Sequence, residues 1–345
     1  MVWQIDDLVD YAFFVEPFVE RATGEGRKCV YLRFAPHPPV LEHRPGLEVV
    51  ELDPGEGFDC FSRDVHRIIE ERGKEVFYIF DNLSALVVEW ATDELLANFF
   101  QVTCPFLFEL DTVAYFALIR GRHSNSMIAR IRDTTQVLID VYRIDGQTYI
   151  HPLKVWDRYS PQMFLPHVVA GSRWSAVSQS GDAAAVSAMA SKFPLRGASA
   201  SIAPWDSIYN RLAISREYPS ALDEAAPETK ALKNELCRML FGHRPEFNRL
   251  AEELFGLDDL FEIRERVVGS GMIGGKAAGM LLARCILAQD AENAGLDLSR
   301  VLEAHDSFYI GSDVFFTFLV ENNLFRLRME LTSDSRLTYE EFEEV

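Results

Sequence analysis

The stretch of sequence best suited to chemistry is rich in glycine and spans residues 268–280, Val-Gly-Ser-Gly-Met-Ile-Gly-Gly-Lys-Ala-Ala-Gly-Met. Gly271, Gly274 and Gly275 have no Cβ, so the backbone N–H groups around them can turn toward an anion. The apolar run that follows predicts a helix whose positive dipole end faces the same place. Lys276 adds a formal positive charge. Together these residues predict a phosphate site.

The spacing of this stretch differs from that of a Walker A loop. Such a loop requires a glycine, four intervening residues, and then Gly-Lys followed by serine or threonine. Here Ser270 occupies the place of the first glycine, and Ala277 follows Lys276. No hydroxyl is therefore available at that position for a magnesium ion, and the sequence does not predict a Walker A loop.

Two alternatives to a dedicated phosphate site stay open from the residues alone. The spacing of Gly269, Gly271 and Gly274 satisfies the dinucleotide-binding pattern, and Asp290 lies near the distance at which that pattern expects an acidic residue. The second alternative is a glycine-rich entry into a helix, in which Lys276 is only solvated.

Residues 273–280, Ile-Gly-Gly-Lys-Ala-Ala-Gly-Met, resemble the Gly-Gly-Lys-Gly/Asn-x-x-Leu signature of the phosphoenolpyruvate synthase and pyruvate phosphate dikinase family. That signature opens a nucleotide-binding domain of ATP-grasp type, and the resemblance extends over residues 260–345. It implies ATP and Mg²⁺ as cofactors, with the signature lysine on the ATP phosphates. The sequence departs from the family at Ala277, where many members have glycine or a polar residue. The residues carried over are Gly274, Gly275 and Lys276, with Gly279 as a further candidate.

The same resemblance implies a reaction. In the family, phosphate passes from ATP to a mobile histidine and then to pyruvate, and related members modify other small acceptors. The phosphohistidine and pyruvate-binding domains of the family have no room after Lys276 in this sequence. We therefore expect the amino-terminal portion of a longer ATP-dependent phosphotransferase, inactive by itself. Its expected partners are a nucleotide and pyruvate or a related small molecule.

The first half of the chain alternates apolar strands with amphipathic helices. Strands separated by helices of about 10–15 residues favour a parallel arrangement. The predicted fold class is therefore α/β, with a doubly wound, mainly parallel sheet over residues 1–165. Strands are expected at residues 2–5, 28–34, 47–52, 75–80 and 113–119, with an antiparallel pair at 135–143 and 147–155.

The rest of the chain is expected to divide into two parts. Residues 166–228 are rich in serine, alanine, glycine and proline, and are interpreted as a linker with short helical patches. Residues 229–345 are interpreted as a helical lead-in followed by a partial α+β segment of ATP-grasp type.

The order of elements in residues 1–165 resembles that of RecA-like ATPases of the circadian-clock KaiC type. Residues 76–81, Val-Phe-Tyr-Ile-Phe-Asp, resemble a Walker B strand. The expected phosphate loop is missing, because Asp6, Asp7 and Asp10 follow the first strand and would repel a triphosphate. We expect a RecA-like scaffold that has lost ATP binding, with Asp81 as a loop cap. The alternative function is therefore a non-catalytic regulatory or interaction module.

The composition limits the class of protein. The net charge of −19 argues against nucleic acid as the main partner, because proteins that bind nucleic acid usually present a basic face. The sequence has no apolar run of the ~20 residues that a membrane span needs, and its start lacks a signal-peptide pattern. The cysteines and histidines are dispersed without the spacing of a zinc site. A cytoplasmic protein without a membrane partner or a protein-held metal is expected.

Overall fold

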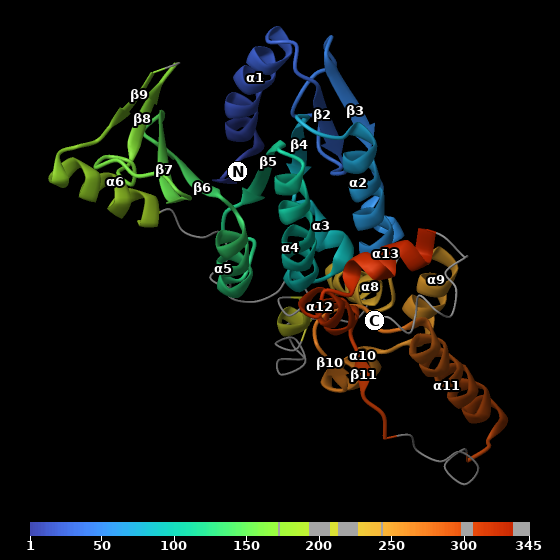
Figure 1. Ribbon diagram of the computed structural model, residues 1–345. Coiled ribbons are helices and arrows are strands. Elements are labelled where there is room, and N and C mark those ends of the chain that lie inside the picture. The colour runs from blue at the N-terminus through green and yellow to red at the C-terminus, as the bar shows by residue number, and fades with distance from the viewer. Residues whose placement is uncertain (172, 193–207, 213–226, 243, 298–305, 334–345) are drawn as a thin grey trace. The chain divides into compact units, whose positions relative to one another are not determined.

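The computed structural model describes residues 1–171, 173–192, 208–212, 227–242, 244–297 and 306–333 (Figure 1). The chain divides into two compact units. The first comprises Met1–Val88 and Leu96–Ile202, and the second comprises Glu89–Leu95 and Ala203–Val345. The first unit contains a large sheet, whereas the described part of the second is mainly helical.

The first unit is built on a sheet of nine strands in the order β3-β2-β4-β5-β1-β6-β7-β8-β9. All pairs among β1 to β6 are parallel, and the pairs from β6 to β9 are antiparallel. The predicted α/β class with a mostly parallel sheet is therefore confirmed. The strands are β1 (Val2–Ile5), β2 (Cys29–Arg33), β3 (Leu47–Glu51), β4 (Phe77–Asn82), β5 (Val113–Ile119), β6 (Val137–Ile144), β7 (Gln147–Val155), β8 (His167–Ala170) and β9 (Arg173–Ala176).

The antiparallel end of the sheet is larger than expected. Two strands, β8 at His167–Ala170 and β9 at Arg173–Ala176, lie within residues 166–228, for which the sequence predicts a linker. The two strands pair antiparallel, and Gly171, which follows β8, has a φ of +59°, a conformation that favours glycine. Each strand has only 4 residues, which is too short to show a clear alternation of apolar and polar side chains.

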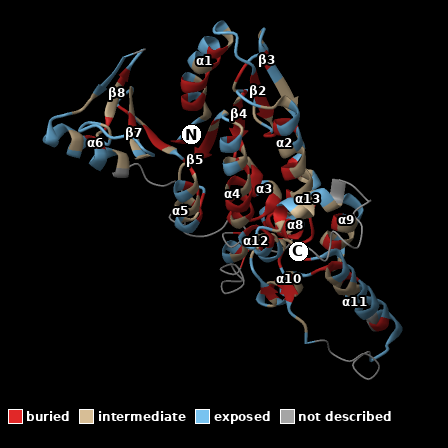
Figure 2. Ribbon diagram, viewed as in Figure 1, coloured by how far each residue is buried: buried red, intermediate tan, exposed pale blue. Residues whose placement is uncertain are grey.

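Helices cover both faces of the parallel part of the sheet. α1 (Leu8–Gly24) packs on the face that carries Trp3, which stacks on Phe14 with ring centroids 4.4 Å apart. α4 (Asp93–Glu109) packs on the opposite face, where Phe100 contacts Phe116 with ring centroids 5.0 Å apart. Figure 2 shows the buried residues concentrated in the strands and in the helix faces turned toward them. The other helices described in this unit are η1 (Pro54–Glu56), α2 (Phe58–Arg72), α5 (Asn125–Thr134), α6 (Ser180–Lys192) and most of α3 (Ser84–Trp90), whose last two residues belong to the second unit.

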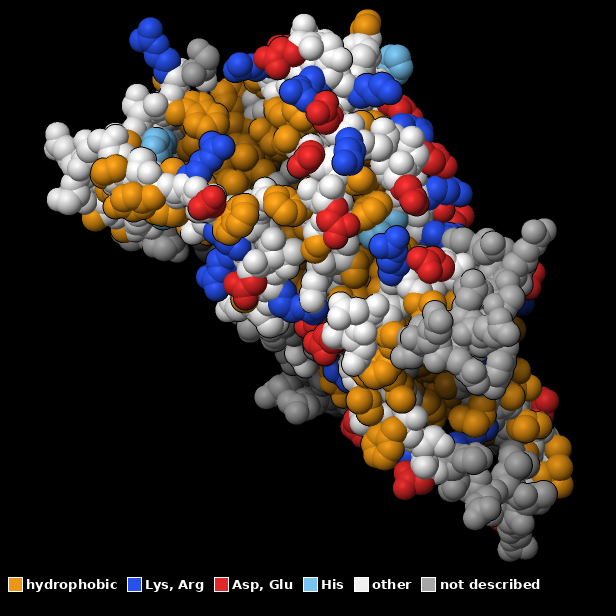
Figure 3. All heavy atoms as spheres, viewed as in Figure 1, with side chains coloured by type: hydrophobic (Ala, Val, Ile, Leu, Met, Phe, Trp, Pro, Cys, Tyr) orange, Lys and Arg blue, Asp and Glu red, His pale blue; other side chains and the backbone are white. Residues whose placement is uncertain are grey.

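The face of the first unit seen in Figure 3 carries charged side chains in one region and hydrophobic side chains in another. Figure 3 shows acidic and basic side chains interspersed over α2, where Arg67 pairs with Asp64. It shows hydrophobic side chains gathered between α1 and the antiparallel strands. There Phe13 is exposed, and Phe14 meets the exposed Trp174 edge to face.

The second unit packs helices around one apolar core and one short parallel strand pair. Leu240, Phe255 and Leu260 are fully buried in that core. The strands β10 (Val267–Val268) and β11 (Tyr309–Ile310) pair in parallel. The helices of its described part include α8 (Pro227–Phe241), α9 (Pro245–Leu254), α10 (Leu257–Glu265), α11 (Gly275–Ala294), α12 (Ser312–Glu321) and α13 (Phe325–Ser333). Among the described residues of both units, no helix has the length and the apolar character that crossing a bilayer requires.

Candidate functional site

The glycine-rich stretch lies in the second unit and connects β10 to α11. Because β10 and β11 run parallel, the chain leaves both strands at the same end of the pair. The loop after β10 therefore meets the start of α12, which follows β11. Met272 and Ser312 join the two segments, since the Ser312 N–H donates to the Met272 carbonyl at 2.8 Å and the Met272 N–H donates to Ser312 Oγ at 3.1 Å.

A buried carboxylate holds the first part of this loop. Asp313, in the first turn of α12, is only 5% exposed. Its oxygens accept the N–H of Ser270 at 2.9 Å, the Ser270 hydroxyl at 3.2 Å and the N–H of Gly271 at 2.7 Å. Ser270 Oγ also lies 2.6 Å from the hydroxyl of Thr92, which belongs to the same unit. The first half of the loop is therefore bound by the protein itself.

This arrangement changes the role expected for Gly271. Its N–H is already bound by Asp313, so it is not free for a nucleotide phosphate. A Cβ at this position would lie 2.5 Å from Ser312 Oγ and 2.7 Å from the backbone nitrogen of Asp313. Gly269, with a φ of +98°, would bring a Cβ within 2.7 Å of the Asp313 carboxylate. These two glycines permit the close approach of α12 rather than the binding of an anion.

The second half of the glycine stretch is open. α11 begins at Gly275, and the N–H of Ala278 donates to the Gly274 carbonyl at 3.0 Å. Among the described residues, no protein acceptor meets the N–H groups of Gly274, Gly275 or Lys276, as expected for the first turn of a helix without a side-chain cap. Lys276 is exposed, and no ion pair with a described residue holds its side chain. Gly279, one turn further, is exposed on the same side of the helix as Gly275.

A second cation stands at the same helix end. The guanidinium of Arg244, the residue that precedes α9, lies so close to Gly275 that a Cβ there would be 3.2 Å from Nη1. Within the described ranges, the guanidinium forms no ion pair or hydrogen bond. The amino end of α11 thus collects exposed N–H groups, the helix dipole and two uncompensated cations, which suits an anion with several oxygens.

Sequence reasoning found Lys276 but missed Arg244. The missed arginine precedes the glycine stretch by a helix, a connection and another helix, so no local spacing relates it to the lysine. Arg244 directly precedes Pro245, the first residue of α9. A proline at this position indicates the start of a helix and does not indicate a ligand site. Only the packing of α9 against α11 brings Arg244 to the glycine.

The corresponding helix end in the first unit is built differently. Asp7 caps α1, and its carboxylate accepts the N–H of Val9 at 2.9 Å. Asp6 lies 3.0 Å from Nε of Arg120, and Asp10 lies 2.6 Å from an Nη of Arg143. Each of the three aspartates after β1 therefore has a partner within the unit. A triphosphate at the start of α1 would have to displace the carboxylate of its own cap.

Asp81 closes the carboxyl end of β4 as a buried loop cap. Its Oδ2 accepts the N–H of Ala35 at 3.2 Å, and its Oδ1 accepts the N–H of Asn82 at 3.0 Å. Nε2 of His37 lies 2.9 Å from Oδ1. The hydrogen bond to Asp81 raises the pKa of His37, against the opposing effect of burial. The carboxylate that resembles a Walker B aspartate is thus occupied by the protein's own donors.

Neither unit shows a protein-built metal site among the described residues, since no group of three or more His, Cys, Asp or Glu side chains is arranged to hold an ion. The donors at the amino end of α11 are N–H groups, a guanidinium and an ammonium, which bind anions and repel free cations.

Comparison with known proteins gives no further guidance. No known protein family matches the sequence, and no curated protein matches it at a significant level.

We predict that Gly271→Ala destabilises the second unit by about 1–3 kcal/mol, because the new methyl group overlaps Ser312 Oγ and a backbone nitrogen. Urea unfolding followed by circular dichroism measures the change. The matched control is Gly279→Ala, which adds a methyl group in open space on α11 and should stabilise by up to about 1 kcal/mol. Equal stability of the Gly271→Ala protein and the wild type would contradict the packing role.

We also predict a pH-dependent cost for His37→Gln. A histidine whose pKa is raised by folding stabilises the protein fully below its unfolded pKa, and this stabilisation is lost as the pH rises through the folded pKa. The loss of unfolding free energy should therefore be larger at about pH 5.5 than at about pH 8.5. Denaturant unfolding at both pH values measures it, with the exposed His43→Gln as control. If the loss of unfolding free energy were larger at alkaline pH, the protonated form of His37 would not be the one that Asp81 stabilises.

Proposed function

We propose that the second unit binds the phosphates of ATP at the amino end of α11, as part of an ATP-dependent phosphotransferase of the phosphoenolpyruvate synthase type. The observation that carries this proposal is the guanidinium of Arg244 beside Gly275, at a helix end that also presents Lys276 and uncapped N–H groups. The guanidinium, the lysine and the N–H groups are three sources of positive potential at one helix end. This arrangement favours a polyphosphate site over a helix start that contacts only solvent.

Each residue would contribute a different kind of contact to the phosphates. The guanidinium of Arg244 offers a planar pair of donors that can bind two phosphate oxygens at once, whereas Lys276 acts as a point charge. The N–H groups of Gly274 and Gly275 would orient the same oxygens, and Gly279 would leave room beside the helix. ATP with its Mg²⁺ supplies the phosphoryl group. In such a site the protein contributes charge neutralisation and positioning.

The sequence resemblance supplies the rest of the proposal. It implies that the phosphoryl group passes through a histidine to pyruvate or a related small acceptor. The short parallel pair β10–β11, flanked by α11 and α12, supports an α+β segment of ATP-grasp type as the setting of the site. The chain would then provide the amino-terminal portion of the nucleotide-binding domain.

The first unit supports the alternative function, a non-catalytic regulatory or interaction module on a RecA-like scaffold. β1 lies between its parallel neighbours β5 and β6, where a phosphate loop would face the sheet's carboxyl edge. In place of such a loop, Asp7 caps α1, and Arg120 pairs with Asp6 and Asp140. Because these carboxylates occupy the place where a phosphate would bind, they support a module that does not bind ATP. The two functions concern different units and are compatible.

We predict that the chain binds Mg·ATP and that Arg244→Met and Lys276→Met each weaken binding at least about tenfold, since a hydrogen bond to a charged group contributes about 1.5–3 kcal/mol. Isothermal titration calorimetry measures the affinities. Arg249→Met on α9 and Lys230→Met on α8 remove exposed cations away from the site, and they should bind like the wild type.

Two results would contradict this proposal. Unchanged affinity in both the Arg244 and Lys276 variants would remove the site from the amino end of α11. Robust ATP-driven phosphorylation of pyruvate by the chain alone would contradict the expectation that it is only the nucleotide-binding portion of the enzyme.

A further inference from the structure

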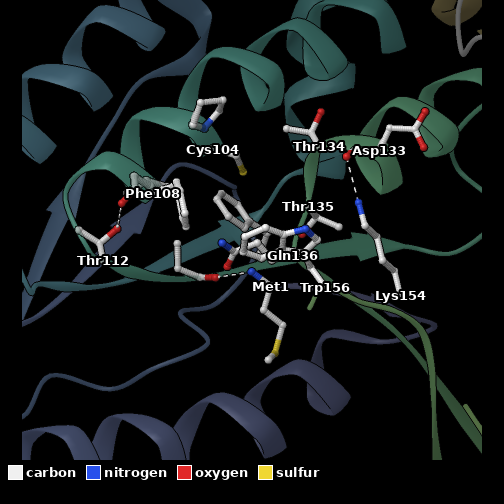
Figure 4. A pocket seen from close by; sticks show the side chains of 14 residues that line it. Met1, Cys104, Phe108, Thr112, Asp133, Thr134, Thr135, Gln136, Lys154 and Trp156 are labelled. Atoms are coloured by element: carbon white, nitrogen blue, oxygen red, sulfur yellow. Dashed lines mark hydrogen bonds between the residues drawn. The ribbon is translucent and has the colours of Figure 1, made fainter. Parts of the chain in front are cut away.

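A cavity of about 310 Å³ lies within the first unit, at the amino-terminal edge of its parallel strands (Figure 4). Residues from the last turns of α4, the start of β5, the connection between α5 and β6, and the end of β7 line it. This is the edge opposite to the one where Asp7 and Asp81 lie. A volume of roughly 300 Å³ is at the lower end of the range for small-molecule sites.

The walls of the cavity are aromatic and unusually open to solvent. Phe108 is 57% exposed and Trp156 is 58% exposed, and their rings stand edge to face with centroids 6.1 Å apart. The buried Phe116 also lines the cavity. Burial raises the pKa of the Cys104 thiol to about 12, so this part of the lining stays uncharged. Because the two rings are nearly perpendicular, a flat apolar ring inserted here could stack on one of them and contact the other through its edge.

The polar groups of the lining include the Lys154 ammonium, the Gln136 amide and the Met1 amino group, which donates to the Ala114 carbonyl at 2.8 Å. The ammonium of Lys154 donates to the carbonyls of Arg132 and Asp133 at 2.6 and 3.0 Å, which leaves one of its three N–H groups. The hydroxyls of Thr134 and Thr135 already donate to backbone carbonyls. A carbonyl or hydroxyl oxygen of a ligand could take the remaining N–H of Lys154, and the Gln136 amide in the same lining could bond to a second polar group of the ligand.

Phosphorylated ligands fit this cavity poorly. α4 and α5 both turn their carboxyl ends toward it, and the partial negative charge at such ends repels anions. The Lys154 ammonium is held at the end of α5, where its charge offsets that of the helix dipole. The cavity is thus chemically distinct from the anion site at the amino end of α11.

We propose that this cavity binds a small, uncharged aromatic molecule that carries a carbonyl or hydroxyl acceptor. The ring packs against Phe108 and Trp156, and the acceptor takes the remaining N–H of Lys154. Such a site gives the first unit a ligand of its own, independent of nucleotide binding by the second unit.

Fluorine NMR of para-fluorobenzamide tests the site directly. The wild-type protein should broaden the ligand resonance, and the double variant Phe108→Ala/Trp156→Ala should lower the affinity at least about fivefold, because an aromatic contact contributes about 0.5–1.5 kcal/mol. Both side chains are more than half exposed, so their loss leaves the buried core intact, which circular dichroism verifies. Trp174→Ala, which removes an exposed tryptophan outside the cavity, is the matched control and should bind like the wild type.

A second probe tests the chemical class. para-Fluorobenzylamine has the same ring, but its ammonium offers no acceptor and would face the like charge of Lys154, so it should bind at least about fivefold more weakly than the amide. Equal broadening by the wild type and the double variant, or no broadening of the amide at millimolar concentration, would overturn the site. Tighter binding of the amine, or of para-fluorobenzoate, would overturn the assignment of an uncharged acceptor.

Discussion

The hydrogen bonds between the Asp313 carboxylate and the glycine stretch fix the conformation of the loop that leads into α11. A carboxylate that is almost fully buried needs several hydrogen bonds, and here the loop amides at Ser270 and Gly271 supply them. The chain then enters α11 at Gly275, and the preceding Gly274 has no side chain that could cap the helix. The loop thus uses half of its glycines for packing and leaves the other half exposed beside Arg244.

The two units treat the amino end of a helix in opposite ways. In the first unit, Asp7 caps α1 with its own carboxylate, and Arg120 and Arg143 neutralise the neighbouring aspartates. In the second unit, the residue before α11 is Gly274, which has no side chain, and the nearby cations have no carboxylate partner among the described residues. The amino end of a helix is therefore capped by a carboxylate in one unit and left without a side-chain cap in the other.

Much of the fold could be predicted because apolar runs bounded by turn residues carry a strong periodic signal. The strands at 2–5, 113–119 and 147–155 have the predicted bounds, whereas the short β8 and β9 carried too few residues to be recognised. The site was only half predictable. Lys276 stands in a local pattern, but Arg244 reaches it through helix packing, and the use of Gly271 depends on an aspartate far away in sequence.

The most direct measurement of the central claim is the amide spectrum of the glycine stretch in nitrogen-labelled protein, recorded with and without Mg·ATP. Binding at the amino end of α11 should shift the resonances of Gly274, Gly275 and Lys276, because their N–H groups would face the phosphates. Gly271 should change much less, since its N–H is bound by Asp313. Unshifted Gly274 and Gly275 resonances at saturating nucleotide would contradict the account.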